Sequence, residues 1–446
     1  SDVCSSDLLA FSTKIIDSGV LDQPSNRIIN EISEIAPDLA IVESFSHAVT
    51  WNSPEGLVVF DTGTYDNGQK VADQIRTWTN APLHAIVYTH GHADHVGGSG
   101  PIAASLGAPG KKIRVIGHEN VKNRLQRYRD TSDWNRLINA RQFGGVREEL
   151  GYGLVSDTSQ VREKKRPTFI DDSVLEVNEE LGDFTSMKIG DDTVEFHHAR
   201  GETDDHLWAY FPDRKWIATG DFIIWNFPNA GNPQKVQRYP IEWAAALRRM
   251  IDQGPELLLP AHGLPIEGKA RIARVLDEIA TALEDLVREV LTMMNAGETL
   301  DTIIHAVKVP DATLGRPYLR PMYDEPEFIV HNVWRQFGGW WDGAASRLKP
   351  ARDAAVGAEL AALAGGADVL IRRAVALAEA GDLRLACHLA DFAGWAAPDD
   401  PEVHGKRAEI YERRRKSELS LMAKGIFSAA AKESHAVIRR SQEQGR

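Results

Sequence analysis

The sequence predicts an α+β protein, in which a mixed domain of strands and helices is followed by an all-helical region. From residue 39 to about residue 262, short apolar runs typical of strands alternate with turns and helix-like stretches. After Gly263, apolar residues recur at helical spacing almost to the end of the chain. The 446 residues, at about 150 per domain, favour two or three domains.

Composition excludes several classes of protein. Hydrophobic residues make up 43% and charged residues 26%, a balance that is ordinary for a folded chain. The net charge of −13 argues against a nucleic-acid partner, because phosphate binding usually needs a basic surface. Two cysteines exclude a disulfide-rich scaffold. The chain has no run of 18 apolar residues, so we expect no transmembrane segment.

Residues 1–8 need separate treatment, because they match the translation of a common sequencing-library adapter. We interpret them as a scar that does not belong to the native fold. On this interpretation the native N-terminus is missing, and a signal peptide cannot be looked for. We therefore expect a soluble protein and leave its compartment, cytoplasmic or periplasmic, open.

The mixed domain is expected to span residues 9–265. Residues 120–180 are polar and rich in arginine, and they predict a long excursion of the kind that often lines an active site. A helix is expected at 71–78. The apolar runs predict strands at 39–45, 56–60, 83–88, 113–116, 193–197, 207–211, 216–219 and 257–259.

Two helical regions are expected after this domain, at 266–348 and 349–446. Apolar residues from Ile272 to Met294 predict one long helix, and the breaks are expected within 309–327 and at 349–350. Residues 367–416 predict paired helices, for which a tetratricopeptide-type array and a plain helical bundle fit equally well. Their contacts should use small residues: Ala374, Ala376, Ala378, Ala386 and Ala390.

The strongest signal is a cluster of three histidines and one aspartate that directly follows the strand at 83–88. It contains His90, His92, Asp94 and His95. Imidazole and carboxylate groups are the ligands that zinc and similar ions use. In an extended strand end, His90 and His92 point to the same side, while Asp94 and His95 lie beyond the bend and can face a second ion. The motif therefore predicts a metal centre.

With this motif the sequence resembles the metallo-β-lactamase superfamily of hydrolases, whose HxHxDH signature is intact here. Other features of that superfamily follow in the same order along the chain. Asp61 ends the strand at 56–60 and resembles the aspartate that braces the metal loop, while His262 in Pro-Ala-His-Gly resembles the final ligand. The resemblance implies an αββα sandwich that holds two metal ions at one edge.

The resemblance extends to the alkyl sulfatase branch of this superfamily. In that branch the third ligand motif carries a glutamate, and a second carboxylate follows 19 residues later, as Glu202 and Asp221 do here. Residues 333–343 resemble the Gly-Trp signature of the branch, and their aromatic side chains are expected in the core or at a dimer contact. The resemblance implies a helical dimerisation domain and a homodimer.

The resemblance also implies a ligand set for two divalent ions, which we expect to be Zn²⁺, although the mixed set also suits manganese or iron. Asp61 is the candidate that orients an imidazole. His206 would replace Glu202 as a ligand if the motif were aligned differently. The first ion would be held by His90, His92 and Glu202, the second by Asp94, His95 and His262, with Asp221 between them.

The implied reaction is hydrolysis of a sulfate ester of an organic alcohol by a metal-bridged hydroxide, with Asp94 and Asp221 as the catalytic carboxylates. Metal coordination lowers the pKa of water from about 15.7 to about 7. Arg141 and Arg238 are the candidates for gripping sulfate oxygens, because arginine forms paired hydrogen bonds to such groups. For each of them, a solvated surface arginine is the competing interpretation.

Two departures from the branch keep other functions open. Alkyl sulfatases usually carry glutamate where Asp221 stands, and their asparagine-rich sulfate-holding stretch is not recognisable at 225–238. A hydrolase of a carboxylic ester, lactone or thioester is therefore one alternative. A non-catalytic metal-binding interaction protein is another, although the complete ligand set argues against it.

Overall fold

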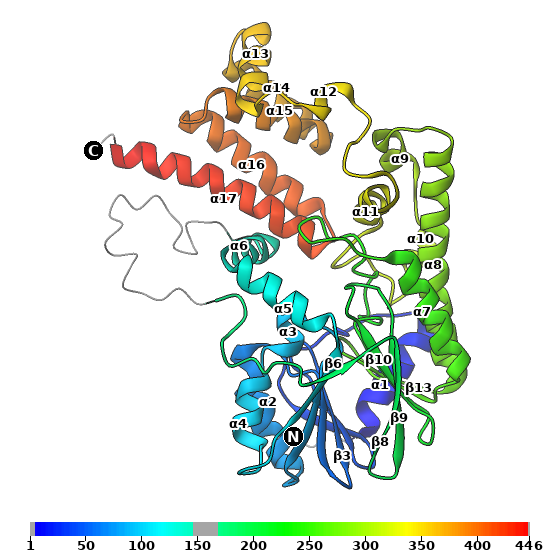
Figure 1. The fold of residues 1–446 in the computed structure, drawn as a ribbon. Helices are drawn as coiled ribbons and strands as arrows, with labels where there is room; N and C mark the ends of the chain where they lie inside the picture. The colour runs from blue at the N-terminus through cyan, green and yellow to red at the C-terminus, as the bar shows by residue number, and fades with distance from the viewer. Residues whose placement is uncertain (1–4, 146–167, 445–446) are drawn as a thin grey trace. The chain divides into compact units, whose positions relative to one another are not determined.

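The structure is a computed structural model that describes residues 5–145 and 168–444 (Figure 1). The chain forms two compact units, which are described separately. The first comprises Ser1–Ser132, Pro167–Glu298 and Thr302–Phe337, and the second Asp133–Arg166, Thr299–Asp301 and Gly338–Arg446, as far as these ranges are described.

The first sheet of the first unit has seven strands among the described residues, in the order β1-β2-β3-β4-β5-β6-β7. Strands β1 to β4 pair antiparallel, while β4 to β7 pair parallel. The strands are β1 (Ile32–Ala36), β2 (Leu39–Val42), β3 (Ala48–Ser53), β4 (Gly56–Phe60), β5 (Leu83–Val87), β6 (Arg114–His118) and β7 (Glu179–Leu181).

The second sheet has six strands in the part of the chain that is described, in the order β13-β12-β11-β10-β9-β8. Its pairs are antiparallel except for β11 with β12, which run parallel. The strands are β8 (Phe184–Ile189), β9 (Asp192–His198), β10 (Leu207–Phe211), β11 (Trp216–Gly220), β12 (Leu257–Pro260) and β13 (Ile266–Glu267).

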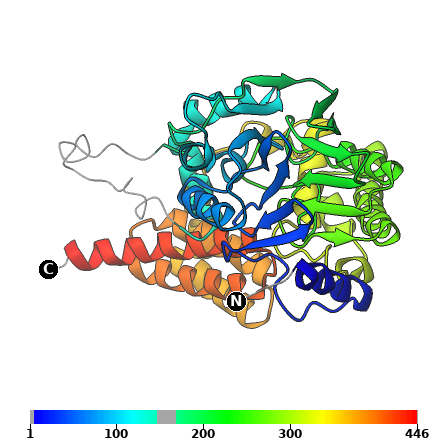
Figure 2. The same ribbon diagram turned by 90° about the horizontal axis from the view of Figure 1, so that it is seen from below.

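The two sheets pack face to face, with helices on both outer sides (Figure 2). The Phe211 ring of the second sheet lies 5.3 Å from the Trp51 ring and 5.9 Å from the Phe60 ring of the first, as measured between ring centroids. Helices α2 (Tyr65–Trp78) and α4 (Ser99–Leu106) cover the first sheet, and α7 (Pro240–Gln253) and α8 (Lys269–Asn295) cover the second. The predicted αββα sandwich is thereby confirmed.

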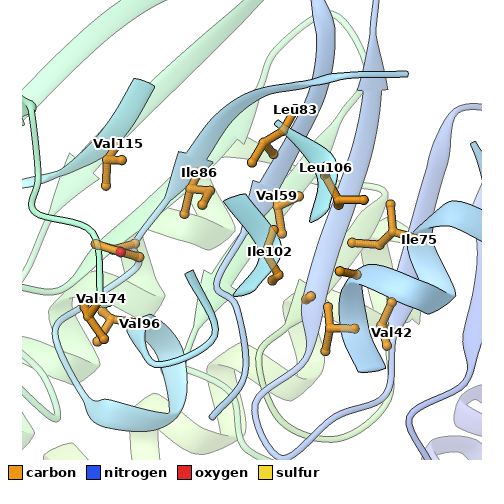
Figure 3. Packing of buried hydrophobic residues seen from close by; sticks show 14 of the residues in the cluster. Val42, Val59, Ile75, Leu83, Ile86, Val96, Ile102, Leu106, Val115 and Val174 are labelled. Carbon is orange, nitrogen blue, oxygen red and sulfur yellow. The ribbon is translucent and has the colours of Figure 1, made fainter. Parts of the chain in front are cut away.

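Helical periodicity explains how α2 joins the core. Val71, Ala72 and Ile75 of α2 are buried and fall on one face of the helix. They pack with Val59 of β4 and Ile86 of β5 in a continuous apolar cluster (Figure 3). Side chains of this size stabilise a fold by about 1.5–3 kcal/mol each when fully buried, so the cluster fixes the strands whose ends carry polar residues.

These polar residues collect at the carboxyl ends of parallel strands. Strands β4 and β5 run parallel; β4 ends just before Asp61, and β5 ends two residues before Thr89. Strands β11 and β12 also run parallel and end just before Asp221 and Ala261. Because parallel neighbours finish at the same edge of a sheet, each sheet brings two loops together there.

The remaining helices of the first unit surround this core. Helix α1 lies against β1 and β13. The long helix predicted from Ile272 to Met294 is present as α8, which packs against α7 and therefore belongs to this unit. The helices not yet given bounds are α1 (Ser5–Ser18), α3 (Ala93–Val96), α5 (Val121–Asp130), α9 (Leu300–Ala306), α10 (Asp311–Leu314) and α11 (Pro326–Gly338).

The second unit is helical in its described part. Ala374, Ala378, Ala386 and Ala390 are buried at the helix contacts as expected, but Ala376 is exposed. Trp340 and Trp341 are exposed as well, which excludes a core position in this chain and leaves the dimer contact as the remaining part of that expectation. The helices are α6 (Ser132–Gln142), α12 (Ala345–Leu348), α13 (Asp353–Ala364), α14 (Ala367–Glu379), α15 (Leu383–Ala396), α16 (Pro401–Ser417) and α17 (Leu421–Gln444).

Within the described residues, no single helix has the length and apolar character needed to cross a membrane, and only α13 with α14, bent by 88°, meets those criteria as a pair. The predicted excursion at 120–180 contains α5 and α6 and extends into residues 146–167, which lie outside the described part of the chain. Strands β1, β3, β7, β8 and β13 were not predicted, because their apolar runs are short or interrupted by polar residues.

Candidate metal centre

The loop after β5 brings four metal-ligand side chains together. His92 is the N-cap residue of the short helix α3, which then carries Asp94 and His95. His90 Nε2 lies 2.9 Å from His92 Nδ1. The three histidines and Asp94 therefore lie close together, in helix α3 and in the few residues that precede it, as the sequence motif predicts.

The loops from the second sheet complete two groups of three possible ligands. One group is His90, His92 and Asp221, and the other is Asp94, His95 and His262; within each, the candidate atoms lie within 4.8 Å of one another.

Asp221 belongs to the first group and also lies close to two members of the second. Its Oδ2 lies 3.3 Å from His95 Nε2 and 3.8 Å from His90 Nε2, while its Oδ1 lies 3.4 Å from His262 Nε2. This is the arrangement that a carboxylate between two ions requires.

The residues fit divalent cations. Two donor atoms that share one tetrahedral Zn²⁺ at about 2.0–2.1 Å lie about 3.3 Å apart. Asp94 Oδ2 lies 3.5 Å from both His95 Nε2 and His262 Nε2. His95 Nε2 and Asp221 Oδ1 are also buried without a hydrogen-bond partner among the described residues, a state that is costly unless something binds them.

The charges at the site also favour a cation. Burial by itself disfavours a charged imidazole, but the carboxylates of Asp221, Asp61 and Asp94 raise the pKa of His95 well above its ordinary value. Positive charge is thus favoured at the point where the imidazole and carboxylate atoms meet. A divalent ion would supply that charge and leave His95 neutral, as a ligand must be.

Asp61 orients His95. Its Oδ2 lies 2.8 Å from His95 Nδ1 and its Oδ1 accepts a hydrogen bond of 2.8 Å from the backbone N–H of Thr89. Asp61 has a φ of 58°, which turns the chain out of β4 and places the carboxylate under the metal loop. With a carboxylate on Nδ1, the ring presents Nε2 to the cluster.

Glu202 lies at the edge of the first group, where its Oε1 is 3.6 Å from His92 Nδ1. The same oxygen is paired with Arg238 Nη1 and accepts a hydrogen bond of 2.5 Å from Asn229 Nδ2. Burial raises the pKa of Glu202 to about 7, and Arg238 opposes this shift. Glu202 is therefore near His92 but also tied to a buried cation.

His206 lies beside the cluster and contacts the backbone. Its Nε2 accepts a hydrogen bond of 3.2 Å from the N–H of Asp221, and its ring stacks on Phe222 at 4.2 Å. Gly220 makes room for this contact, since a Cβ there would lie 2.5 Å from His206 Nε2. In this geometry His206 holds the backbone of Asp221. Neither His206 nor Glu202 belongs to the two groups of candidate ligands, so the choice of Glu202 over His206 stays a prediction.

Arg238 is buried, so the competing interpretation of a solvated surface arginine is wrong for this residue. Its Nη1 also donates a hydrogen bond of 3.3 Å to the backbone oxygen of Asn229, while its Nε has no partner among the described residues. Arg141 lies on α6 in the second unit and is partly buried. Its role in binding substrate stays a prediction.

Sequence patterns did not indicate Arg124 and Asp205. Asp205 Oδ2 accepts a hydrogen bond of 2.9 Å from the N–H of Gly91, inside the metal loop, and its Oδ1 lies 2.9 Å from Arg124 Nε. Burial would raise the pKa of Asp205, but Arg124 lowers it below its ordinary value. The one feature of the sequence that could have indicated Asp205 is its position three residues after Glu202.

A third group of possible ligands consists of His118, Asp183 and His198. The rings of His118 and His198 stack 3.8 Å apart. His198 Nδ1 lies 3.1 Å from Asp183 Oδ1, and its Nε2 lies 2.9 Å from the backbone oxygen of Asp204. Both nitrogens of His198 thus lie within hydrogen-bond distance of oxygen atoms, so this side chain already has partners within the protein.

Comparison with known families agrees with this geometry. The family model of the metallo-beta-lactamase superfamily matches residues 43–262, which carry all the residues of both candidate ligand groups. The model named alkyl sulfatase dimerisation matches residues 299–436. The part of the chain that carries the candidate ligands is thus similar to the metallo-beta-lactamase superfamily. Its helical segment and its relatives support the resemblance to the alkyl sulfatase branch.

Individual relatives and solved structures are similar over most of this chain. A linear primary-alkylsulfatase from Pseudomonas sp. is 25% identical over 81% of this chain and 69% of the relative. An (R)-specific secondary-alkylsulfatase from Pseudomonas sp. is 24% identical over 80% of this chain and 55% of the relative. The structure of the stereoselective inverting sec-alkylsulfatase Pisa1 from Pseudomonas sp. has a TM-score of 0.74 at 21% identity, covering 91% of this chain and 66% of that one. The chain therefore spans about half to two thirds of the length of these relatives.

Proposed function

We propose that this protein is a dinuclear-metal hydrolase that cleaves the sulfate ester of an organic alcohol. The observation that carries the proposal is Asp221, whose two oxygens face both groups of imidazole and carboxylate ligands. When bound, two divalent ions supply Lewis acidity and make water acidic enough to attack near neutral pH. We propose Zn²⁺ as the ion.

Each side chain then has a definite task. We assign His90, His92 and Glu202 to one ion and Asp94, His95 and His262 to the other, with Asp221 between them. Asp61 holds the ring of His95 in place, and Asp205 holds the backbone of Gly91. Positions fixed in this way limit the rearrangement that the site must undergo during a reaction.

Arg238 supports sulfate as the substrate anion. Its guanidinium is buried beside Glu202, and its Nε has no partner among the described residues, so one donor is available to an oxyanion. Lys235 adds positive charge nearby. Burial and Arg238 lower its pKa to about 8, and the negative charges of Asp94 and Glu202 oppose this shift. These basic groups compensate locally for a net charge of −13.

The decisive experiment measures sulfate release from dodecyl sulfate by the zinc-loaded protein. We expect turnover by the wild type and none by His92→Ala or Asp94→Ala. His331→Ala, which changes an exposed residue of α11, is the matched control and should leave turnover unchanged.

Other outcomes would identify a different function. Hydrolysis of a carboxylic ester, lactone or thioester of matched chain length, without sulfate release, would make the chain an esterase or lactonase on the same fold. Full metal content without hydrolysis of any of these substrates would leave a metal-binding interaction protein.

We also propose that the chain forms a homodimer. The segment matched by the alkyl sulfatase dimerisation model supports this proposal. Trp340 and Trp341, which belong to that segment, are exposed, and large exposed aromatic side chains commonly mark a protein interface.

A further inference from the structure

Helix α11 holds the backbone of Arg238 through one buried side chain. Asn332 of α11 is only 4% exposed. Its Oδ1 accepts a hydrogen bond of 3.3 Å from the N–H of Arg238, and its Nδ2 donates one of 2.9 Å to the carbonyl oxygen of Arg238. The amide of Asn332 thus pairs with both backbone polar groups of a single residue.

The orientation of this amide is determined by its surroundings. Oδ1 faces three N–H donors, from Arg238, Gln237 and Arg335, at 3.1–3.3 Å. Nδ2 faces a carbonyl oxygen. If the amide were reversed, Nδ2 would face these three N–H donors and Oδ1 would face the carbonyl oxygen. The hydrogen-bond network therefore selects one orientation.

The segment just before α11 holds the same loop at a second point. Buried Asp324 accepts a hydrogen bond of 2.7 Å from the N–H of Gly231. Gly231 packs so closely on the first turn of α11 that a Cβ there would lie 2.3 Å from the backbone nitrogen of Ile329. Residues 231–238 are therefore fixed at both ends by this part of the chain.

Arg238, at one end of this loop, and Asn229, two residues before its other end, both contact Glu202. Asn229 Nδ2 and Arg238 Nη1 both bind Oε1 of Glu202. The same oxygen lies 3.6 Å from His92 Nδ1. A change in the backbone of Arg238 would move the guanidinium and, with it, the carboxylate that we assign to the first ion.

We infer that Asn332 is a positioning residue for the metal centre, acting through Arg238 on Glu202. The inference rests on the proposed assignment of Glu202 to the first ion. Asn332 touches no reacting group, so its effect should appear as metal affinity. It follows that the segment matched by the dimerisation model also shapes the site at which the first ion would bind.

Two substitutions at position 332 test different properties of the amide. Asn332→Ala removes both hydrogen bonds and leaves two buried backbone groups of Arg238 unpaired. Asn332→Asp keeps the volume but places an oxygen against the carbonyl oxygen of Arg238, where Nδ2 now donates. Val333→Ala, a buried neighbour on α11, is the control for general loss of packing.

The measurement is Zn²⁺ affinity and stoichiometry, by competition with a chromophoric chelator, together with the thermal midpoint of each variant. Residues that orient metal ligands typically contribute 10–100-fold to metal affinity. We expect a loss of that size for one of the two ions in Asn332→Ala and Asn332→Asp. Val333→Ala should lower the thermal midpoint and keep both affinities.

Wild-type affinity for both ions in either Asn332 variant would overturn the inference. If Asn332→Ala does not fold, Asn332→Asp alone decides the question, because it preserves the shape of the side chain. The readout is independent of turnover, so an absence of sulfate release by the wild type would refute the proposed function and leave this test intact.

Discussion

Asp61 and His95 form a buried pair, with 2.8 Å between Asp61 Oδ2 and His95 Nδ1. The pair joins the end of β4 to α3 and fixes which ring nitrogen faces the metal centre. Because Thr89 also donates its hydroxyl to Asp61 Oδ2, the carboxylate is held from two sides. The ring of His95 is therefore oriented before any ion arrives.

We expect Asp61→Ala to weaken Zn²⁺ binding by about 10–100-fold at one of the two sites. The ring of His95 would lose the acceptor at Nδ1 that selects its tautomer. Chelator competition measures the affinity, and Asp66→Asn, an exposed carboxylate on α2, is the control. An unchanged affinity in Asp61→Ala would contradict the assigned role.

Substitution of Asp221 should reduce the binding of both ions, whereas substitution of His262 should reduce the binding of one. Asp221 faces both groups of ligands, whereas His262 belongs to one. Metal analysis of the purified variants should give two ions per chain for the wild type, about one for His262→Ala and fewer than one for Asp221→Ala. Two ions in Asp221→Ala would exclude a shared carboxylate.

The buried pair of Glu202 and Arg238 should appear in the stability of the metal-free protein. Removing one partner of a buried pair typically costs about 3–5 kcal/mol, because the other charge is left uncompensated. We expect Arg238→Met to lower the free energy of unfolding by that amount in urea denaturation. The double variant Glu202→Gln/Arg238→Met should recover part of the loss. Strictly additive losses would show that the two side chains do not interact.

The pair of Asp205 and Arg124 predicts a dependence of stability on pH. Arg124 outweighs burial and lowers the pKa of Asp205 below the ordinary value of 3.8. A depressed carboxylate pKa contributes stability above pH 3.8, and this contribution is lost as the pH falls further. The difference in unfolding free energy between wild type and Asp205→Asn should therefore be full at pH 7 and shrink below pH 3.8. A difference that grows in acid would have the wrong sign.

The homodimer proposal predicts a molecular mass in solution of about twice the 49.3 kDa of one chain. Light scattering at micromolar concentration measures it. The double variant Trp340→Ser/Trp341→Ser should shift the mass toward one chain if these exposed rings lie in the interface. A monomeric wild type would refute the proposal directly.

Local pattern was enough for the metal loop and for most of the elements around it. His90, His92, Asp94 and His95 lie within six positions, so the strand that precedes them and the bend that follows place them together. Helix α8 was equally accessible, because its apolar residues repeat with the period of a helix. Strand β3 is not predicted by local pattern, because polar residues interrupt its short apolar run, and only its pairing with β2 and β4 shows that it is a strand.

Only the tertiary structure decided how the site is supported. Arg238 was expected as a substrate-binding residue with a surface position as the alternative, and the fold buries it against Glu202. Arg124 reaches Asp205 across 81 positions, and Asn332 reaches Arg238 across 94.

The physical reason for this difference is that some properties depend on residues close in sequence and others on residues brought together only by the fold. Ligand chemistry and periodicity are properties of neighbouring residues, and they can be recognised without knowing the fold. A buried polar side chain must find a partner, but any distant donor or acceptor can serve. The packing of the two sheets and of α11 selects that partner, and through it the final positions of the metal-binding groups.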